Sequence, residues 1–117
     1  FNTVLNTPVF QAVWRRVVKD GRFWHHEWTV KADPDTVFFP LRLLNVLQGQ
    51  DRLVGQVGNG AYLNNCVYGL HGPLEVLSRR AIEVYSRREY LCDQRPPQED
   101  VYLQACMMKL GVLQVNH

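Results

Sequence analysis

The chain has 117 residues, of which 46% are hydrophobic, which is enough for one hydrophobic core but not for two. We therefore expect a single domain that spans residues 1–117. The 13 Lys and Arg residues are scattered along the chain and only slightly exceed the 11 Asp and Glu residues. This distribution argues against a nucleic-acid-binding surface and against a patch that binds a membrane surface.

The N-terminus has neither the basic nor the apolar region of a signal peptide, and no run approaches the roughly eighteen apolar residues of a membrane span. We expect that an anchor or signal and further sequence precede Phe1 in the intact protein. Contact with a membrane would then occur only through that anchor.

The three cysteines, Cys66, Cys92 and Cys106, lack the Cys-x-x-Cys spacing of structural zinc sites. Two alternatives stay open. The cysteines form one disulfide and leave one free thiol, or all three are buried and behave as small hydrophobic side chains.

The first predicted helix covers residues 8–20, because proline suits its first position and Gly21 suits its exit. Its apolar residues recur at helical spacing and leave the basic residues for water. These apolar residues are Val9, Phe10, Val13, Trp14, Val17 and Val18. A second, short helix begins at Pro40 and closes at residues 48–51.

Two more helices are predicted in the C-terminal half. Ser78 is a suitable N-cap for a helix over about residues 79–90, whose four arginines we expect on a solvated face. The last helix covers residues 98–110 and ends at Gly111. Three of its apolar residues share one face: Val101, Ala105 and Met108.

Strand patterns lie between these helices. Residues 28–32 (WTVKA) predict a buried strand that stops at residues 33–35 (DPD), where proline cannot donate to a sheet. Residues 53–57 and 65–77 contain β-type segments that are interrupted by glycines. Because helices alternate with strands, we expect an α/β fold.

Asp33 and Asp35 are the most informative polar residues, because they follow the predicted strand of residues 28–32 directly. Open α/β folds bind ligands at the carboxyl ends of their strands, and hard oxygen ligands there suit a divalent ion that bridges to a diphosphate. The alternative is an Asp-Pro turn in which Asp33 caps its own backbone.

Two other segments carry candidate site residues. Glu99 and Asp100 open the last helix, where a fixed carboxylate can act as a general base, although acidic residues also occur there because they favour the helix dipole. Gly72 lies in a glycine-containing segment and either lets the backbone approach a sugar closely or forms a plain turn. The pair His25–His26 lacks a third metal ligand and is expected at the surface, whereas a role for His117 stays open.

Three of these segments carry motifs in a fixed order. Residues 28–36 (WTVKADPDT) match the pattern W-x-x-K-x-D-D-D-T apart from its central Asp, and residues 72–79 (GPLEVLSR) match G-A-G-Y-V-L-S-R in part. Residues 97–112 match P-x-E-D-V-x-x-G-x-C-x-x-x-L-G-V except that Gln104 replaces the first glycine. In this combination the chain resembles the Fringe and β-1,3-galactosyltransferase family, which includes the core 1 galactosyltransferases.

The resemblance implies a glycosyltransferase-A type fold, a uridine diphosphate (UDP) sugar as donor, a Mn²⁺ ion and inversion at the anomeric carbon. By resemblance, Asp35 is the metal ligand, Asp33 lies beside the metal or the ribose, and Gly72 lies near the donor sugar. Asp100 is the implied general base, and we expect it to face the same cleft as both aspartates. Glu99 should point elsewhere, because adjacent residues on a helix do not share a face.

The resemblance also implies partners and a compartment. The partners are a nucleotide sugar and a glycan or glycoprotein acceptor, and the compartment is the Golgi lumen. In an oxidising compartment we expect at least one disulfide among the three cysteines.

Two alternatives to this enzyme stay open. Three substitutions in the motifs favour a non-catalytic glycan-binding or scaffold relative with a decayed donor site: Pro34, Leu74 and Glu75. The intact acidic residues of the first and third motifs favour the enzyme. A phosphoryl-transfer or hydrolytic metal enzyme is the other alternative, but no phosphate-binding glycine loop accompanies the carboxylates.

Overall fold

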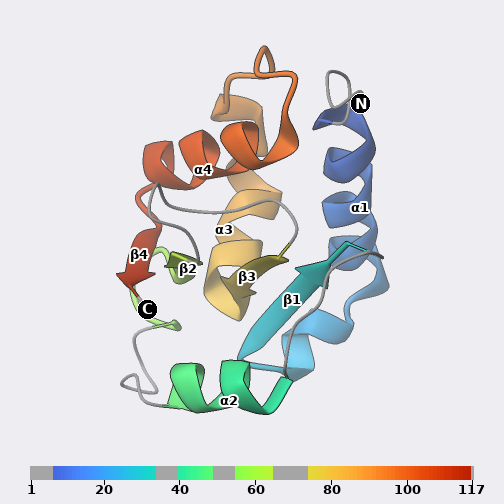
Figure 1. Ribbon diagram of the computed structural model, residues 1–117. Helices are drawn as coiled ribbons and strands as arrows, with labels where there is room; N and C mark the ends of the chain where they lie inside the picture. Colours follow the sequence, from blue (N-terminus) through green and yellow to red (C-terminus); the bar gives the residue numbers. More distant parts are fainter. Residues whose placement is uncertain (1–6, 34–39, 49–54, 65–73, 117) are drawn as a thin grey trace.

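The computed structural model describes residues 7–33, 40–48, 55–64 and 74–116. Figure 1 shows how the helices and strands of these residues are arranged. In chain order they are α1 (Thr7–Asp20), the 3-10 turn η1 (Arg22–His25), β1 (Trp28–Ala32), α2 (Pro40–Gln48), β2 (Ala61–Asn64), β3 (Leu74–Ser78), α3 (Arg79–Arg88), the 3-10 turn η2 (Glu89–Leu91), α4 (Glu99–Lys109) and β4 (Leu113–Asn116).

The four strands of the described residues form one mixed sheet in the order β1-β3-β2-β4. β3 pairs antiparallel with both β1 and β2, whereas β2 and β4 are parallel. The register places Lys31 of β1 directly opposite Glu75 of β3. Helices and a mixed sheet together make this a mixed α/β fold, in agreement with the predicted class.

Helices cover both faces of the sheet. Successive strand residues point to opposite faces, so neighbouring residues of one strand show what packs on each side. Tyr62 and Leu77 belong to a core cluster that also contains buried side chains from α1, α3 and α4. Their neighbours Leu63 and Val76 belong to a second cluster, against which Leu43 of α2 packs. The described chain therefore has three layers, with α2 below the sheet in Figure 1.

The predictions for α1 and β1 are confirmed in their bounds. α1 covers Thr7–Asp20, buries Trp14 (1% exposed) and ends before Gly21, whose φ is 83°. β1 covers Trp28–Ala32. It was expected to be a buried strand, and this is wrong, because β1 lies at an edge of the sheet and none of its residues is fully buried.

Ser78 is the N-cap of α3, as predicted. Its hydroxyl oxygen accepts hydrogen bonds from the backbone N–H groups of Ala81 (3.1 Å) and Ala61 (3.0 Å), so that it also joins β2 to the start of the helix. The expected solvated arginine face is confirmed only at the C-terminal end of α3. Near its beginning, Arg79 and Arg80 are half-buried and donate to backbone carbonyl oxygens of other segments.

The predicted position of the last helix is confirmed, but the apolar face named in the prediction is not the face that packs on the core. α4 covers Glu99–Lys109 and is followed by Gly111, whose φ of 78° favours glycine. The apolar residues expected to share a face are exposed, since 50% of Val101 and 64% of Met108 is accessible. The core side of α4 carries other residues: Tyr102, Leu103, Cys106 and Met107.

The glycine-rich middle of the chain was the least accurately predicted. Residues 55–57, part of an expected β-type segment, form a turn, and the strand lies later, at Ala61–Asn64. Within the expected segment of residues 65–77, β3 covers Leu74–Ser78. β4 was not predicted.

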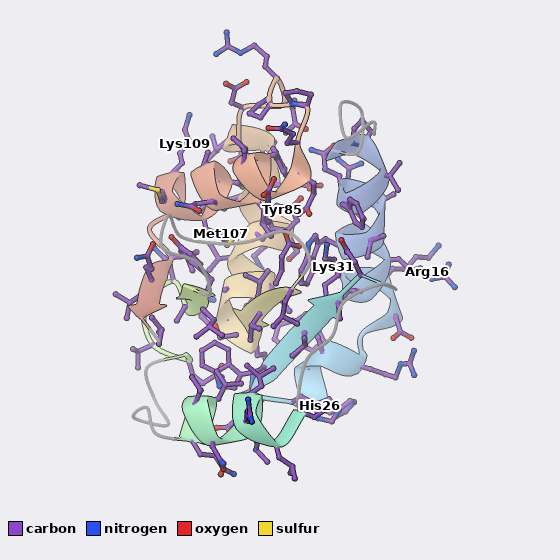
Figure 2. All side chains as sticks on the ribbon, viewed as in Figure 1. Arg16, His26, Lys31, Tyr85, Met107 and Lys109 are labelled. Atoms are coloured by element: carbon purple, nitrogen blue, oxygen red, sulfur yellow. A yellow bond between two sulfur atoms is a disulfide. The ribbon has the colours of Figure 1, made fainter. Side chains whose placement is uncertain are left out.

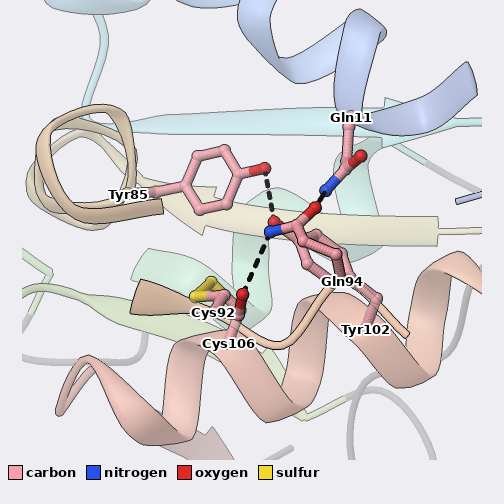
Figure 3. The surroundings of a disulfide bond; sticks show 6 residues. All are labelled: Gln11, Tyr85, Cys92, Gln94, Tyr102 and Cys106. Carbon is pink, nitrogen blue, oxygen red and sulfur yellow. Dashed lines mark hydrogen bonds between the residues drawn. A yellow bond between two sulfur atoms is a disulfide. The ribbon is translucent and has the colours of Figure 1, made fainter. Parts of the chain in front are cut away.

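Cys92 and Cys106 form a disulfide with their Cα atoms 5.0 Å apart, which confirms the expectation of at least one disulfide. Cys66 lies outside the described residues. Beside the disulfide, the hydroxyl groups of Tyr85 and Tyr102 are hydrogen-bonded at 3.1 Å, and Figure 3 shows them between α3 and α4. The disulfide therefore ties Cys92, in the segment that precedes α4, to Cys106 within that helix.

Across the described residues, no helix has the length and apolar character that crossing a membrane requires.

Candidate functional site

The ammonium group of Lys31 lies among three carboxyl groups. Its Nζ is 2.9 Å from Oδ1 of Asp33, 3.4 Å from Oε1 of Glu75 and 3.5 Å from Oε1 of Glu99. We refer to these four residues, Lys31, Asp33, Glu75 and Glu99, as the Lys31 cluster. Figure 2 shows Lys31 between β1 and α1.

Four elements build this cluster. Lys31 and Glu75 are direct partners across the antiparallel strands β1 and β3, so their side chains lie on the same face of the sheet. α1 covers them there: the Phe10 ring centroid is 4.1 Å from Nζ of Lys31, and Nε1 of Trp14 donates to Oε1 of Glu75 at 3.4 Å. Glu99, the first residue of α4, completes the group.

The cluster is buried at one end and open at the other. Glu75 is fully buried and Glu99 is 2% exposed. The side chain of Lys31 is 10% exposed, and that of Asp33 is 27% exposed. Asp33 is therefore the member of the cluster that can meet a ligand from solvent.

Burial decides the protonation of the cluster. Removal from water, followed by the nearby charge of Glu99, raises the pKa of Glu75 to about 10, so that Glu75 is protonated at neutral pH. A hydrogen bond between the two carboxyl groups favours the protonated form of Glu75 and the ionised form of Glu99. Burial also raises the pKa of Glu99, and both this hydrogen bond and Lys31 oppose that rise.

Lys31 stays charged in this environment. Burial by itself would lower the pKa of Lys31, but the surrounding carboxyl groups outweigh burial and the pKa is raised. The cluster thus brings the charged ammonium group of Lys31 together with three carboxyl groups, of which that of Glu75 is protonated at neutral pH. A buried charge is tolerated only when it is paired in this way.

The structure describes two of the predicted site residues fully. Asp33 follows β1 directly, as expected for a residue at a strand end. Asp100 lies in the first turn of α4, where it is half-buried and its Oδ1 accepts a hydrogen bond from the backbone N–H of Val101 at 2.9 Å. Three predicted or candidate residues lie outside the described residues: Asp35, Gly72 and His117.

The expectation that Glu99 points away from Asp33 is wrong. Glu99 contacts Lys31, which also contacts Asp33. The reason is the helical period, because Glu99 stands three, four and seven residues before Tyr102, Leu103 and Cys106 and therefore shares the buried face of α4 with them.

Other candidates lie apart from the cluster. His25 and His26 are both exposed, as predicted. Within the described ranges, no group of three or more His, Cys, Asp or Glu side chains is arranged to hold a metal ion. Asp33 fits such an ion as one hard oxygen ligand, since its carboxylate is partly exposed at a strand end.

Sequence reasoning missed Lys31 and Glu75 as members of the site. A signal for Glu75 existed, because a carboxyl group in the otherwise apolar segment Leu74–Ser78 must find a partner if the strand is buried. Lys31, in a strand of similar length, is the natural partner in an antiparallel pair, but the register of that pair cannot be read from the sequence.

No family model, characterised protein or solved structure matches the chain. The three motif segments meet in the folded chain. The first motif contributes Lys31 and Asp33, the second contributes Glu75, and the third contributes Glu99, so that three segments far apart in the sequence meet at one ammonium group.

Proposed function

We propose that the chain is the metal-binding and catalytic part of an inverting glycosyltransferase, which transfers a sugar from a UDP-sugar to a hydroxyl group of a glycan or glycoprotein. A glycosyltransferase-A type fold is part of this proposal. The observation that carries it is the meeting of the three motif segments at the Lys31 cluster.

Asp33 and Asp35 would hold a Mn²⁺ ion at the end of β1. Such an ion, when bound, stabilises the negative charge that the diphosphate leaving group gains. Lys31 already donates a hydrogen bond to Oδ1 of Asp33 at 2.9 Å, so this carboxylate would be shared between the ammonium group and the ion. Gly72 belongs to the second motif, where its backbone would approach the donor sugar.

Asp100 would act as the general base. As the acceptor oxygen forms its bond to the anomeric carbon, the bond to the diphosphate breaks on the opposite face and its electron pair leaves with the diphosphate. The proton of the acceptor hydroxyl goes to the Asp100 carboxylate. Support comes from the position of Asp100 next to Glu99, a member of the Lys31 cluster in the same helix turn.

The disulfide supports the proposed compartment. Disulfides persist mainly in oxidising environments, and Cys92–Cys106 would be stable in the Golgi lumen. There the protein would be held through an N-terminal anchor and meet UDP-sugars and glycoprotein acceptors.

A specific observation favours a second candidate, a non-catalytic glycan-binding relative. The Lys31 ammonium lies 2.9 Å from Oδ1 of Asp33 and neutralises part of the charge that a metal ion would need. Pro34 also replaces one carboxylate of the first motif. In this case the chain would bind a glycan without transferring a sugar.

A transfer assay with product analysis distinguishes the two candidates. The full-length protein is incubated with a panel of UDP-sugars, glycan acceptors and Mn²⁺, and the anomeric configuration of the product is determined by NMR. The enzyme gives a product of inverted configuration, and chelation of Mn²⁺ stops the reaction reversibly. Glycan binding without transfer supports the second candidate, and a product of retained configuration contradicts an inverting mechanism.

A further inference from the structure

Lys31 connects two elements that carry different parts of the proposed chemistry. On one side its ammonium group contacts Asp33 at the end of β1, and on the other it contacts Glu99 at the beginning of α4. Asp100 follows Glu99 directly. The distance between the end of β1 and the start of α4 is therefore set by groups that all meet Lys31.

We propose that Lys31 and Glu99 are positioning residues, which hold Asp100 of α4 at a fixed place relative to Asp33 of β1. This inference rests on the proposed function for its catalytic consequence. Its structural content, an energetic coupling between Lys31 and Glu99, can be tested without any substrate.

The coupling is expected because this ion pair is buried. The Lys31 side chain is 10% exposed and that of Glu99 is 3% exposed, so water screens neither charge well. Ion pairs at the surface contribute little to stability, whereas removing one partner of a buried pair leaves a charge without compensation.

The ammonium group also has little freedom to move. Glu75 contacts it from the opposite strand, and the Phe10 ring of α1 lies 4.1 Å away. Trp14 of α1 in turn holds Glu75 by a hydrogen bond. With neighbours on β3, α1 and α4, Lys31 has one favourable position.

α4 packs mainly against α1 and η2 rather than against β1. The ion pair between Glu99 and Lys31 therefore supplies a direct link between α4 and β1 that the helix packing does not provide. Loss of this link would let the start of α4 shift relative to Asp33. A shift of about 1 Å in a reacting group can cost on the order of a hundredfold in rate.

A double-mutant cycle on the unliganded protein tests the link. We expect Lys31→Met to lower Tm by about 10 °C or more, because it leaves the Glu99 carboxylate buried without a cation. Adding Glu99→Gln removes that charge and should restore at least about half of the loss. Lys19→Met, which changes an exposed lysine on α1, is the matched control and should leave Tm unchanged.

The cycle has a clear contrary outcome. If the losses in Lys31→Met and Glu99→Gln simply add in the double variant, the two residues are not coupled and the inference is wrong. If Lys31→Met does not fold at all, a double variant that folds supports the coupling, and a double variant that also fails to fold overturns it.

Turnover and its pH dependence test the catalytic consequence. Glu99→Gln should lower kcat by about 10- to 100-fold and change the donor Kd by less than about threefold, since Glu99 is buried and the proposed function gives it no part in holding the metal or the donor. The acidic limb of the pH profile should remain, because Asp100 is still the base. Loss of that limb would make Glu99 the base itself, and an unchanged kcat would end the positioning role.

The two levels of the inference fail in different ways. If the unaltered protein transfers no sugar while the cycle shows coupling, the proposed function fails and the structural link stands. If the protein is active and the cycle shows no coupling, the link fails and the proposed function stands.

Discussion

Glu75 lies inside an apolar strand, directly opposite Lys31, and burial raises its pKa to about 10. The folded protein therefore keeps a proton that the unfolded chain releases above its ordinary value of 4.5. Folding takes up one proton between these limits. The contribution of Glu75 to stability is fully present below the pKa of the unfolded chain, 4.5, and is lost as the pH rises towards the pKa of the folded protein, about 10.

We predict that Glu75→Gln flattens the dependence of stability on pH. In the natural protein, the Glu75 carboxyl group makes the free energy of unfolding fall as the pH rises. The fall is at most about 1.4 kcal/mol for each pH unit between about pH 5 and pH 9. Glutamine has nearly the same shape and cannot release a proton. Urea unfolding of both proteins at pH 6 and pH 8 measures the difference, and equal slopes would show that Glu75 is ionised in the folded state.

Asp100 is predicted to be essential for turnover and unimportant for donor binding. A base that removes only the acceptor proton contributes to the transition state, so Asp100→Asn should lose kcat by on the order of a hundredfold or more. Donor binding should barely change. Asp93→Asn, at an exposed carboxylate paired with Arg95, is the control and should keep its rate. Near-normal turnover in Asp100→Asn would remove the base assignment.

For single residues, the sequence predicted the position of Asp33 correctly but not the direction in which the Glu99 side chain points. Proline after a β-branched run is a local signal, and Asp33 does lie at the strand end. Whether Glu99 or Asp100 faces inward depends on the rotation of α4, and a difference of one residue turns the side chain by about 100°. Local patterns do not fix that rotation.

Among the helices and strands, α3 has the clearest local sequence signal, its N-cap Ser78, and a substitution can test this cap. Ser78→Ala removes the acceptor of two backbone N–H groups, from Ala81 and Ala61, at a fully buried site. We expect a loss of about 2 kcal/mol in the free energy of unfolding. Ser86→Ala, whose hydroxyl donates to a helix carbonyl, is the control and should change stability by less than about 0.5 kcal/mol. Equal losses in both variants would contradict the cap.

The disulfide gives the second prediction for an element. Cys92 and Cys106 are separated by 14 residues, and a loop of this length is stabilised by about 3 kcal/mol in the chain-entropy description. Replacing both by alanine should lower the free energy of unfolding by about that amount. In Cys66→Ala, mass mapping without reductant should still find the bond. A different pairing, or unchanged stability after replacement, would contradict the structure.

Long or well-capped elements were predictable and short ones were not. α1, β1 and α3 have strong boundary signals in proline, glycine and serine. β2 and β4 have four residues each, too few for a period to show. α4 is apolar on both sides, so its pattern does not reveal that Met107 is buried while Met108 is exposed.

For the whole molecule, the α/β class followed from alternating helices and strands, but the sheet order did not. β2 pairs in parallel with β4 across most of the C-terminal half, and β3 lies between β1 and β2. Such contacts between distant segments leave no local mark. The Lys31 cluster depends on the same contacts, which is why its residues appeared only as separate motifs in the sequence.

The most direct test of the central claim is calorimetry of UDP binding with and without Mn²⁺, because it requires neither an acceptor nor knowledge of the sugar. The full-length protein should bind UDP tightly only when Mn²⁺ is present. Asp35→Ala should weaken this binding at least about tenfold, since a lost metal ligand costs more than 1.4 kcal/mol. Equal binding of UDP without Mn²⁺, or an unchanged Kd in Asp35→Ala, would contradict a metal-dependent glycosyltransferase.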